Sequence, residues 1–492
     1  MKIKKILLLI APAYTFKYFR DIDPLPPLGL GYLAAAVKDL GVAVEILDCL
    51  VLGWNHEEEV AGNLVRVGLP NSEIETYIRQ FDPDLIGINC QFSRQYKIYH
   101  ELFALAKKVK PQCITMGGGA HVTVCPEEVL QDPSCDYVLL GEAENSFKDF
   151  ITKVNQGADL TASDGFGYKS NGRIYVNKKT RWITDLDSIP YPAYDMIDLP
   201  KYAGLQTAHG LRHKDRFCPI VTSRGCPAKC TFCSACQVWG NRYRMRSVEN
   251  VIGEMRLLKE KYNVEELMFE DDNVTAHPKR AKELFSRMIE NRFNFTWDTP
   301  NGVGVWSLDE ETLDLIKKSG CVKLNFAVES GSQEVLTKIV KKPLNLARVK
   351  KLIAHCKNIG LDYGMFLVVG LPGEKISDMW KSISYAVECG CYDPHISIAT
   401  PYPGTELFSV CKEKGYFVRE FKYEDLFIKS YMLQTPDWDE KKLQKFMSQV
   451  TVYLKIRRFL ARPGLLIDWT IKSFKNPKKL YNYVANLIRP LL

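Results

Sequence analysis

The stretch "RGCPAKCTFCSAC", residues 224–236, places Cys226, Cys230, Cys233 and Cys236 within eleven positions. Four thiols so close together in sequence predict a metal site. A structural zinc site usually takes its four cysteines from two separated parts of the chain, because four ligands in so short a stretch strain to surround one ion tetrahedrally. The spacing therefore favours a metal centre of another kind.

Two iron–sulfur interpretations remain. Cys230, Cys233 and Cys236 show the spacing C-x2-C-x2-C of a ferredoxin, but the further cysteine before a proline that should follow is absent. Cys226, Cys230 and Cys233 instead form a C-x3-C-x2-C loop. Its three thiolates would bind three irons of a [4Fe–4S] cluster and leave the fourth iron open to a small-molecule ligand. In this register Cys236 is a spare thiol that packs at the start of the following helix.

The cysteine stretch opens a region, residues 216–410, in which strands and helices alternate. Six strand-like segments are separated by helical stretches such as "SVENVIGEMRLLKEKY": "CPIVTSRG", "ELMFEDD", "FTWDTP", "VKLNFAVES", "DYGMFLVVG" and "HISIATPYP". Six such units predict a partial (β/α)6 barrel, whose chemistry lies at the C-terminal ends of its strands.

Residues 1–155 also alternate between strands and helices. "KKILLLIAP", "VAVEILDC", "DLIGINCQ", "CITMGGG" and "DYVLLGEAE" are apolar enough for strands covered on both faces. Their spacing predicts a doubly wound, Rossmann-like parallel sheet that binds ligands beyond the carboxyl ends of its strands. The loops to consider there are "APAYTFKYF", "CQFSRQY" and "GGGAHVT". The last is not a dinucleotide fingerprint, because that motif lies near the first strand and opens directly into a helix.

Residues 156–215 are interpreted as a connector with one hairpin signal, "SNG". Residues 411–492 are interpreted as a helical, basic region. Nine basic residues and one acid after position 450 account for the whole net charge of +8. This tail either lies on an anionic membrane surface or forms a helical cap with a solvated basic face.

The 15 cysteines favour a reducing compartment with one metal site. Cys49, Cys90, Cys113 and Cys321 are expected to be small buried hydrophobes. No segment reaches the roughly 18 uninterrupted apolar residues of a membrane span, and the apolar run near the N-terminus is interpreted as a buried strand. We therefore expect a cytoplasmic protein, with membrane association as an additional hypothesis.

With "GCPAKCTFC" in place, the sequence resembles the radical S-adenosylmethionine (SAM) superfamily. Further matching segments follow in order: "FEDDN", "NFAVESGS", "FLVVGLPGE" and "PYPGTEL". The resemblance implies a [4Fe–4S] cluster on Cys226, Cys230 and Cys233 whose fourth iron is chelated by SAM. It also implies a set of SAM contacts: the aromatic Phe232, Glu270 and Asp271 toward the amino group, Glu329 toward the ribose, and the backbone of Val369 and Gly370 at the adenine.

The first region resembles the cobalamin-binding domain found upstream of many radical SAM enzymes. The matching text is "PLPPLGLGYLAAAVKDLGVAVEILD", "PDLIGINC", "ITMGGGAHVTVCPEEVL" and "DYVLLGEAE". The motif D-x-H-x-x-G, whose histidine ligates cobalt from below, is absent after the first strand, which implies cobalamin without a lower-face histidine. Candidate contacts with the corrin or its phosphate are Tyr14, Phe92, Gly117, Gly118, Gly119 and His121.

The resemblance implies a cobalamin-dependent methyltransferase. One SAM would methylate cobalamin, and a second would yield a 5′-deoxyadenosyl radical that activates a carbon of a small-molecule or lipid substrate. An electron donor such as ferredoxin or flavodoxin is implied, and no catalytic side chain is assigned. The alternatives are an oxidative cyclase of the same architecture and a non-catalytic corrinoid-binding protein. Nucleic acid is not expected as a partner, because the first 450 residues carry no net charge.

Overall fold

The computed structural model describes residues 2–18, 20–205, 209–210, 213–426 and 430–464. Two compact units divide the chain. The first comprises Met1–Pro227, Ser234–Asn301 and Lys318–Val322. The second comprises Ala228–Cys233, Gly302–Lys317 and Lys323–Leu492.

The first unit contains a seven-stranded sheet with the order β10-β9-β8-β7-β6-β1-β3. Its parallel strands are β1 (Lys5–Ile10), β3 (Ala43–Asp48), β6 (Leu85–Asn89), β7 (Ile114–Gly118) and β8 (Tyr137–Leu139). Alternate residues of β1 enter two different cores, because helices cover both faces of the sheet. The predicted doubly wound sheet is confirmed.

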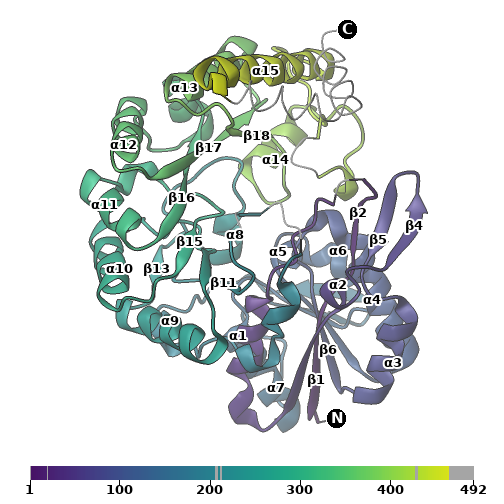
Figure 1. Cartoon of the computed structure of the whole chain (residues 1–492). Helices are drawn as coiled ribbons and strands as arrows, with labels where there is room; N and C mark the ends of the chain where they lie inside the picture. The colour runs from purple at the N-terminus through teal and green to yellow at the C-terminus, as the bar shows by residue number, and fades with distance from the viewer. Residues whose placement is uncertain (1, 19, 206–208, 211–212, 427–429, 465–492) are drawn as a thin grey trace. The chain divides into compact units, whose positions relative to one another are not determined.

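The helices on the two faces can be followed in Figure 1. α3 (Asn71–Phe81), α4 (Tyr96–Val109) and α6 (Pro126–Gln131) contribute to one core, and α1 (Leu28–Ala36) and α7 (Glu144–Gln156) contribute to the other. The shorter α2 (Cys49–Leu52) and α5 (Ala120–Val124) follow β3 and β7 directly. The carboxyl ends of β1, β6 and β7 thus carry the three loops that the sequence indicated.

Two features of this unit were not predicted: a small separate sheet, and the pairing of the connector hairpin with the first sheet. The stretch "APAYTFKYF", expected to be a loop, contains β2 (Ala13–Phe16). β2 pairs antiparallel with β5 (Leu64–Val67), which pairs with β4 (Glu57–Ala61) in a small separate sheet. The predicted "SNG" hairpin does form, as β9 (Phe166–Ser170) and β10 (Arg173–Val176), with left-handed Asn171 and Gly172 at its turn. It pairs onto β8 and so extends the first sheet.

The second sheet contains the six predicted strands in sequence order: β11 (Phe217–Ile220), β14 (Glu266–Phe269), β15 (Thr296–Asp298), β16 (Cys321–Glu329), β17 (Asp362–Val369) and β18 (His395–Ile398). The pairs β11–β14, β14–β15, β16–β17 and β17–β18 are parallel. α9 (Val248–Tyr262) and α10 (Pro278–Glu290) accompany the strands of the first unit, and α12 (Leu346–Asn358) and α13 (Ile376–Glu388) those of the second. The predicted strand–helix alternation is confirmed.

Further helices and strands lie between these elements and after them in sequence. β12 (Ser223–Arg224) and β13 (Arg244–Met245) pair antiparallel, and α8 (Ala235–Trp239) lies between them in sequence. α11 (Glu310–Lys318) precedes β16, a π-helix covers Val335–Val340, and α14 (Glu406–Glu413) and α15 (Glu440–Ala461) belong to the C-terminal part.

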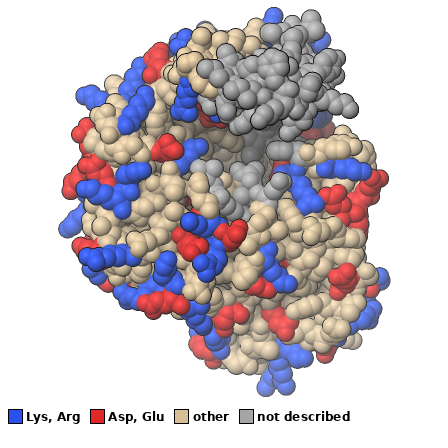
Figure 2. All heavy atoms as spheres, in the orientation of Figure 1, with Lys and Arg blue, Asp and Glu red and all other residues tan. Residues whose placement is uncertain are grey.

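The predicted helical C-terminal region is confirmed as far as α15, and the basic tail from residue 465 onward lies outside the described residues. Along the described part of the chain, no helix combines the length and apolar character needed to cross a membrane. Figure 2 shows Lys and Arg interspersed with Asp and Glu over the described residues of the face in view.

Candidate cofactor sites

The three predicted cluster ligands lie on the loop between β12 and α8. Cys226 and Cys230 are half-buried and Cys233 is exposed. Among the described residues, no three His, Cys, Asp or Glu side chains converge to hold a single metal ion. An iron–sulfur cluster is held through separate iron atoms, so its thiolates need not meet at one point. Three accessible thiols on one loop therefore fit the open-iron [4Fe–4S] cluster.

The remaining cysteines divide as the sequence suggested. Cys49, Cys90, Cys113 and Cys321 are buried, as predicted. Burial raises the pKa of the Cys49 thiol well above its usual range, so this group does not supply a thiolate. Cys236 is half-buried in the first turn of α8, the position expected for the spare thiol.

The second unit fixes the middle of the cysteine loop through Thr231. Its N–H donates to the carbonyl of Val340 (3.2 Å), and its hydroxyl donates to the carbonyl of Ile339 (3.0 Å). Its own carbonyl accepts from the N–H of Leu407 at the start of α14 (2.9 Å). The carbonyls come from the last turn of the π-helix, a form that recurs at functional sites. Phe232, the aromatic of the motif, follows directly and is half-buried.

The carboxylate of Asp271, predicted to face the SAM amino group, accepts hydrogen bonds from neighbouring groups of the protein. It is buried and accepts hydrogen bonds from the Thr222 N–H (3.0 Å), the Thr222 hydroxyl (2.7 Å) and the Ser223 hydroxyl. Arg280 in turn donates to the Thr222 hydroxyl (2.9 Å). Burial raises the pKa of Asp271. Asp271 thus fixes the strand end that precedes the cysteine loop.

Glu270 and Asp272, on either side of Asp271, have different surroundings. Asp272 accepts from the N–H of Gly225 (3.1 Å), and burial raises its pKa to about 6. Glu270 is half-buried. Its carboxylate accepts a hydrogen bond from the side-chain amide of Asn301 (3.3 Å) and lies 3.1 Å from Nε2 of His209. Burial opposes protonation of His209, but the hydrogen bond and charge of Glu270 raise its pKa. Of the two predicted amino-group contacts, Glu270 keeps the more open position, and His209 is a neighbour that the sequence did not reveal.

Glu329 ends β16 in an unusual conformation. It has a φ of +68°, at an irregularity in the pairing of β16 with β17. Such a backbone conformation costs free energy in a non-glycine residue, and strained residues of this kind cluster at functional sites. Its carboxylate is buried and accepts from Nζ of Lys342 (2.7 Å), which also lies 5.7 Å from the centre of the Trp306 ring. Lys342 follows the π-helix and was not predicted.

The segment after β17 is fixed by a buried carboxyl group. The N–H groups of Gly370 (2.9 Å) and Leu371 (3.2 Å) donate to Oε2 of Glu374, which is fully buried. Burial raises the pKa of Glu374 to about 8. Trp438 donates from its indole to the Glu374 carbonyl (3.0 Å). Val369 is buried and Gly370 has a left-handed φ of +78°, so the proposed adenine segment is a rigid turn.

The structure distinguishes the three glycines predicted to meet cobalamin. A side chain at Gly117 would press on Phe103 (3.2 Å) and Val122 (3.3 Å), so this glycine serves helix packing. Gly119 has a φ of +109°, and a Cβ there would lie 2.8 Å from Asn89. Beside Gly118 only a carbonyl oxygen lies within 4 Å, at 3.9 Å. Gly118 is therefore the glycine with room for a ligand.

The other residues predicted to contact cobalamin, Phe92, Tyr14 and His121, also differ in their surroundings. Phe92 is 63% exposed in the loop after β6, so its ring is accessible to a ligand. Tyr14 lies on β2, and its hydroxyl donates to Oε1 of Glu101 (2.5 Å). Burial and that hydrogen bond raise the pKa of Tyr14. His121 is buried, with Nδ1 3.0 Å from the Ser93 hydroxyl and Nε2 3.0 Å from Glu128.

A buried ion-pair network joins the cysteine loop to the first sheet inside the first unit. Arg224, two residues before Cys226, donates to Glu142 (3.1 Å) in the loop after β8 and to Glu144 (2.5 Å), the first residue of α7. Arg244 of β13 also donates to Glu142 (2.7 Å). Arg224 and Glu142 are 82 positions apart, so the sequence showed each residue but not their pairing.

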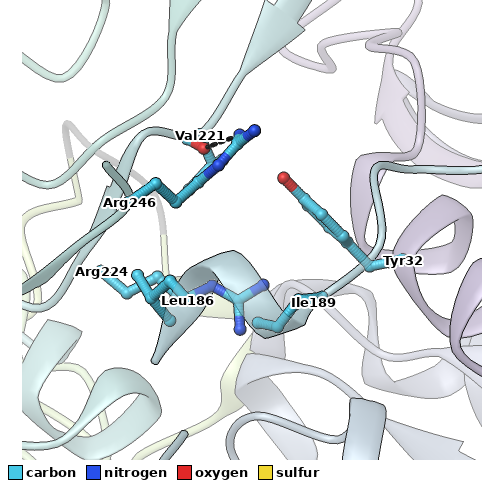
Figure 3. Close-up of a pocket in the computed structure, with 6 residues that line it drawn as sticks. All are labelled: Tyr32, Leu186, Ile189, Val221, Arg224 and Arg246. Atoms are coloured by element: carbon cyan, nitrogen blue, oxygen red, sulfur yellow. Dashed lines mark hydrogen bonds between the residues drawn. The ribbon is translucent and has the colours of Figure 1, made fainter. Parts of the chain in front are cut away.

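Figure 3 shows the small cavity beside this network. It is lined by Tyr32, Leu186, Ile189, Val221, Arg224 and Arg246. Tyr32 points its hydroxyl toward Arg246, which donates to the carbonyl of Val221 (2.9 Å). The cavity volume of about 10 Å³ has room for about one water molecule. The cavity therefore belongs to the structural network and has no room for a cofactor.

Two family models match the chain. Residues 220–386 match the model of the radical SAM superfamily, and residues 23–151 match that of the B12 binding domain. Cytidylyl-2-hydroxyethylphosphonate methyltransferase of Streptomyces wedmorensis is 32% identical over 92% of this chain and 90% of its own. The anaerobic magnesium-protoporphyrin IX monomethyl ester cyclase of Rubrivivax gelatinosus is 25% identical over 93% of this chain and 79% of its own.

The fold has a solved counterpart. The radical SAM methyltransferase TsrM from Kitasatospora setae, solved with cobalamin and a [4Fe–4S] cluster, superimposes with a TM-score of 0.67 at 17% identity, over 85% of this chain and 79% of that one. The chain belongs to the radical SAM superfamily, in the group whose members carry a B12-binding domain ahead of the radical SAM domain. The predicted membership of the radical SAM superfamily and the predicted presence of both kinds of domain are confirmed.

Proposed function

We propose that the protein is a cobalamin-dependent radical SAM methyltransferase that methylates an unactivated carbon of a small-molecule substrate. The observation that carries the proposal is the pairing of a B12-binding domain with a radical SAM domain in a chain 32% identical to a methyltransferase over 92% of its length. The accessible Cys226, Cys230 and Cys233 support it.

The residues divide the work between the two domains. Cys226, Cys230 and Cys233 hold the cluster, Glu270 and Glu329 bind SAM, and Gly118 and Phe92 contact the corrin. When bound, the cluster and SAM supply a 5′-deoxyadenosyl radical, and cobalamin supplies the methyl group. Thr231 fixes the middle of the cysteine loop, and Asp271 fixes the strand end that precedes it. The domains are proposed to span residues 1–155 and 216–410, with the connector between them.

The products of SAM distinguish this proposal from its alternatives. Reconstituted protein is incubated with SAM, a reductant and candidate substrates, and S-adenosylhomocysteine and 5′-deoxyadenosine are quantified. Comparable amounts of both support methyl transfer. Formation of 5′-deoxyadenosine alone supports a cyclase. Absence of both products supports a corrinoid-binding protein without catalysis. Cys230→Ala must abolish deoxyadenosine formation.

The cyclase is the second candidate, because cyclases also resemble the chain over nearly its whole length. We also propose a one-electron donor such as ferredoxin or flavodoxin, which the radical chemistry requires, and a cytoplasmic location. The basic composition of residues 451–492 supports a lipid substrate and membrane contact as a further proposal.

A further inference from the structure

A continuous chain of polar side chains begins at the carboxyl end of the first sheet. The Ser93 hydroxyl lies 3.0 Å from Nδ1 of His121, and Nε2 of His121 lies 3.0 Å from Oε2 of Glu128. Oε1 of Glu128 lies 2.9 Å from Nε2 of His100, whose Nδ1 lies 2.7 Å from Asp132. The cobalamin proposal uses His121 only as a candidate contact and assigns no role to the other four residues.

His100 and Glu128, in the outer half of this row of hydrogen-bonded side chains, have defined protonation states. Both ring nitrogens of His100 face carboxylates, and an ionised carboxylate only accepts hydrogen bonds. Both nitrogens therefore carry hydrogen, and His100 is a cation. Burial opposes this charge, but Asp132 and Glu128 raise the pKa of His100 to about 9. Burial also acts to raise the pKa of Glu128, but the two histidines outweigh it and lower that pKa to about 2.

The ionised Glu128 fixes the inner half as well. Because Glu128 only accepts, the Nε2 of His121 must donate to it, and we assign Nδ1 of this buried ring as the acceptor. The Ser93 hydroxyl is the group that faces Nδ1, so it donates its hydrogen there. The Ser93 oxygen is left with lone pairs and no hydrogen for any further partner.

Ser93 lies where a ligand of the B12-binding domain would be met. It is half-buried, begins the 3-10 turn Ser93–Gln95 and directly follows the exposed Phe92. The loop is held in place, because the Phe92 N–H donates to the Tyr99 hydroxyl (3.0 Å) and the Tyr99 hydroxyl donates to the Phe92 carbonyl (3.2 Å). Buried Cys90 also accepts at its carbonyl from the N–H of His121 (3.0 Å).

We propose that Ser93 is a specificity residue that accepts a hydrogen bond from a carboxamide N–H of the corrinoid, and that His121 is a positioning residue which, through Glu128, holds Ser93 as an acceptor. This inference rests on the proposed function. An acceptor matches the amide side chains of the corrin ring and rejects groups that only accept, namely carboxylates and phosphate. A site built for an N–H donor discriminates strongly against a ligand that lacks it.

Corrinoid selectivity tests the proposal on the full-length chain. Equilibrium dialysis measures the Kd of hydroxocobalamin and of its monocarboxylate derivatives, in each of which one propionamide is hydrolysed. Wild-type protein should bind the parent about tenfold or more tightly than at least one derivative. Ser93→Ala and Glu128→Gln should each reduce this ratio to about threefold or less, the latter because glutamine also donates and so releases the tautomer of His121. Glu127→Gln, an exposed neighbour, should leave the ratio unchanged.

A second measurement needs no ligand and no variant. The ¹⁵N shifts of His121 in the wild-type protein at neutral pH should report the Nε2–H tautomer, and those of His100 should report the imidazolium. An Nδ1–H tautomer at His121 would overturn the inference. So would a wild-type protein that binds cobalamin without selectivity, or a Ser93→Ala protein that keeps it. Failure of the wild-type protein to bind hydroxocobalamin at all would instead refute the proposed function.

Discussion

Cys236 and the three proposed cluster ligands differ in their place on the chain. The ligands lie in the loop, whereas Cys236 belongs to the first turn of α8. We predict that Cys236→Ala keeps a full complement of iron and sulfide and still cleaves SAM, because the fourth iron must stay open to SAM. Alanine at Cys226, Cys230 or Cys233 should abolish the cluster. Iron and sulfide analysis of the four variants measures this, and loss of the cluster in Cys236→Ala would restore the ferredoxin-like register.

Glu329 and Lys342 form a buried ion pair, and removing one member leaves the other charge uncompensated. Lys342→Met should therefore lower the free energy of unfolding by about 3 kcal/mol. The double variant Glu329→Gln/Lys342→Met should recover part of the loss, since both charges are gone. The control is Lys341→Met, which removes only a surface pair with Glu406 and should cost about 1 kcal/mol or less. Urea unfolding that gives equal losses for the two lysines would contradict the pairing.

At the scale of elements, the turn after β17 depends on the protonated form of Glu374. Its pKa is raised to about 8 by burial, so above about pH 4.5 the folded state keeps a proton that the unfolded state releases. Stability should therefore fall as pH rises toward 8, by about 2–3 kcal/mol between pH 6 and 8. The glutamine of Glu374→Gln stays neutral and keeps an acceptor for the two N–H groups. This variant should therefore lose less stability than the wild type between pH 6 and 8.

Thermal unfolding between pH 6 and 8.5 measures this difference. Glu388→Gln, which changes an exposed acid at the end of α13, is the matched control and should follow the wild type. If Glu374→Gln also loses stability in parallel with the wild type, the turn does not depend on the proton of Glu374.

The elements show what local patterns predict and what they do not. Continuous apolar runs predicted β1, β6 and β7 because both faces of these strands are covered. β2 was missed because its partner is set far along the chain, with Ala13 opposite Val67. The same holds for the sites. The sequence gathered Glu270, Asp271 and Asp272 at one strand end, but only the hydrogen bonds show that Asp271 is occupied by Thr222 and Ser223.

For the whole molecule, the location of charge predicts behaviour at a membrane. The described end of α15 already exposes Ile456 (50%) and Leu460 (72%) beside Arg457 and Arg458, and most of the basic tail follows. The full-length chain should bind anionic vesicles at low salt and dissociate at high salt, since each basic side chain near such a surface contributes about 1 kcal/mol. A variant with Lys472, Lys475, Lys478 and Lys479 changed to Gln should bind more weakly. Absence of binding at low salt in a vesicle sedimentation assay would leave the tail as a solvated cap.

One measurement tests, without knowledge of the substrate, whether this one chain uses both cofactors for methyl transfer. Reconstituted protein is incubated with hydroxocobalamin, a strong reductant and SAM labelled with ¹³C and deuterium in its methyl group. The corrinoid is then extracted, and its mass is measured by mass spectrometry. We expect labelled methyl on the corrinoid together with S-adenosylhomocysteine. Formation of 5′-deoxyadenosine with no labelled methyl on the corrinoid would contradict it and favour the cyclase.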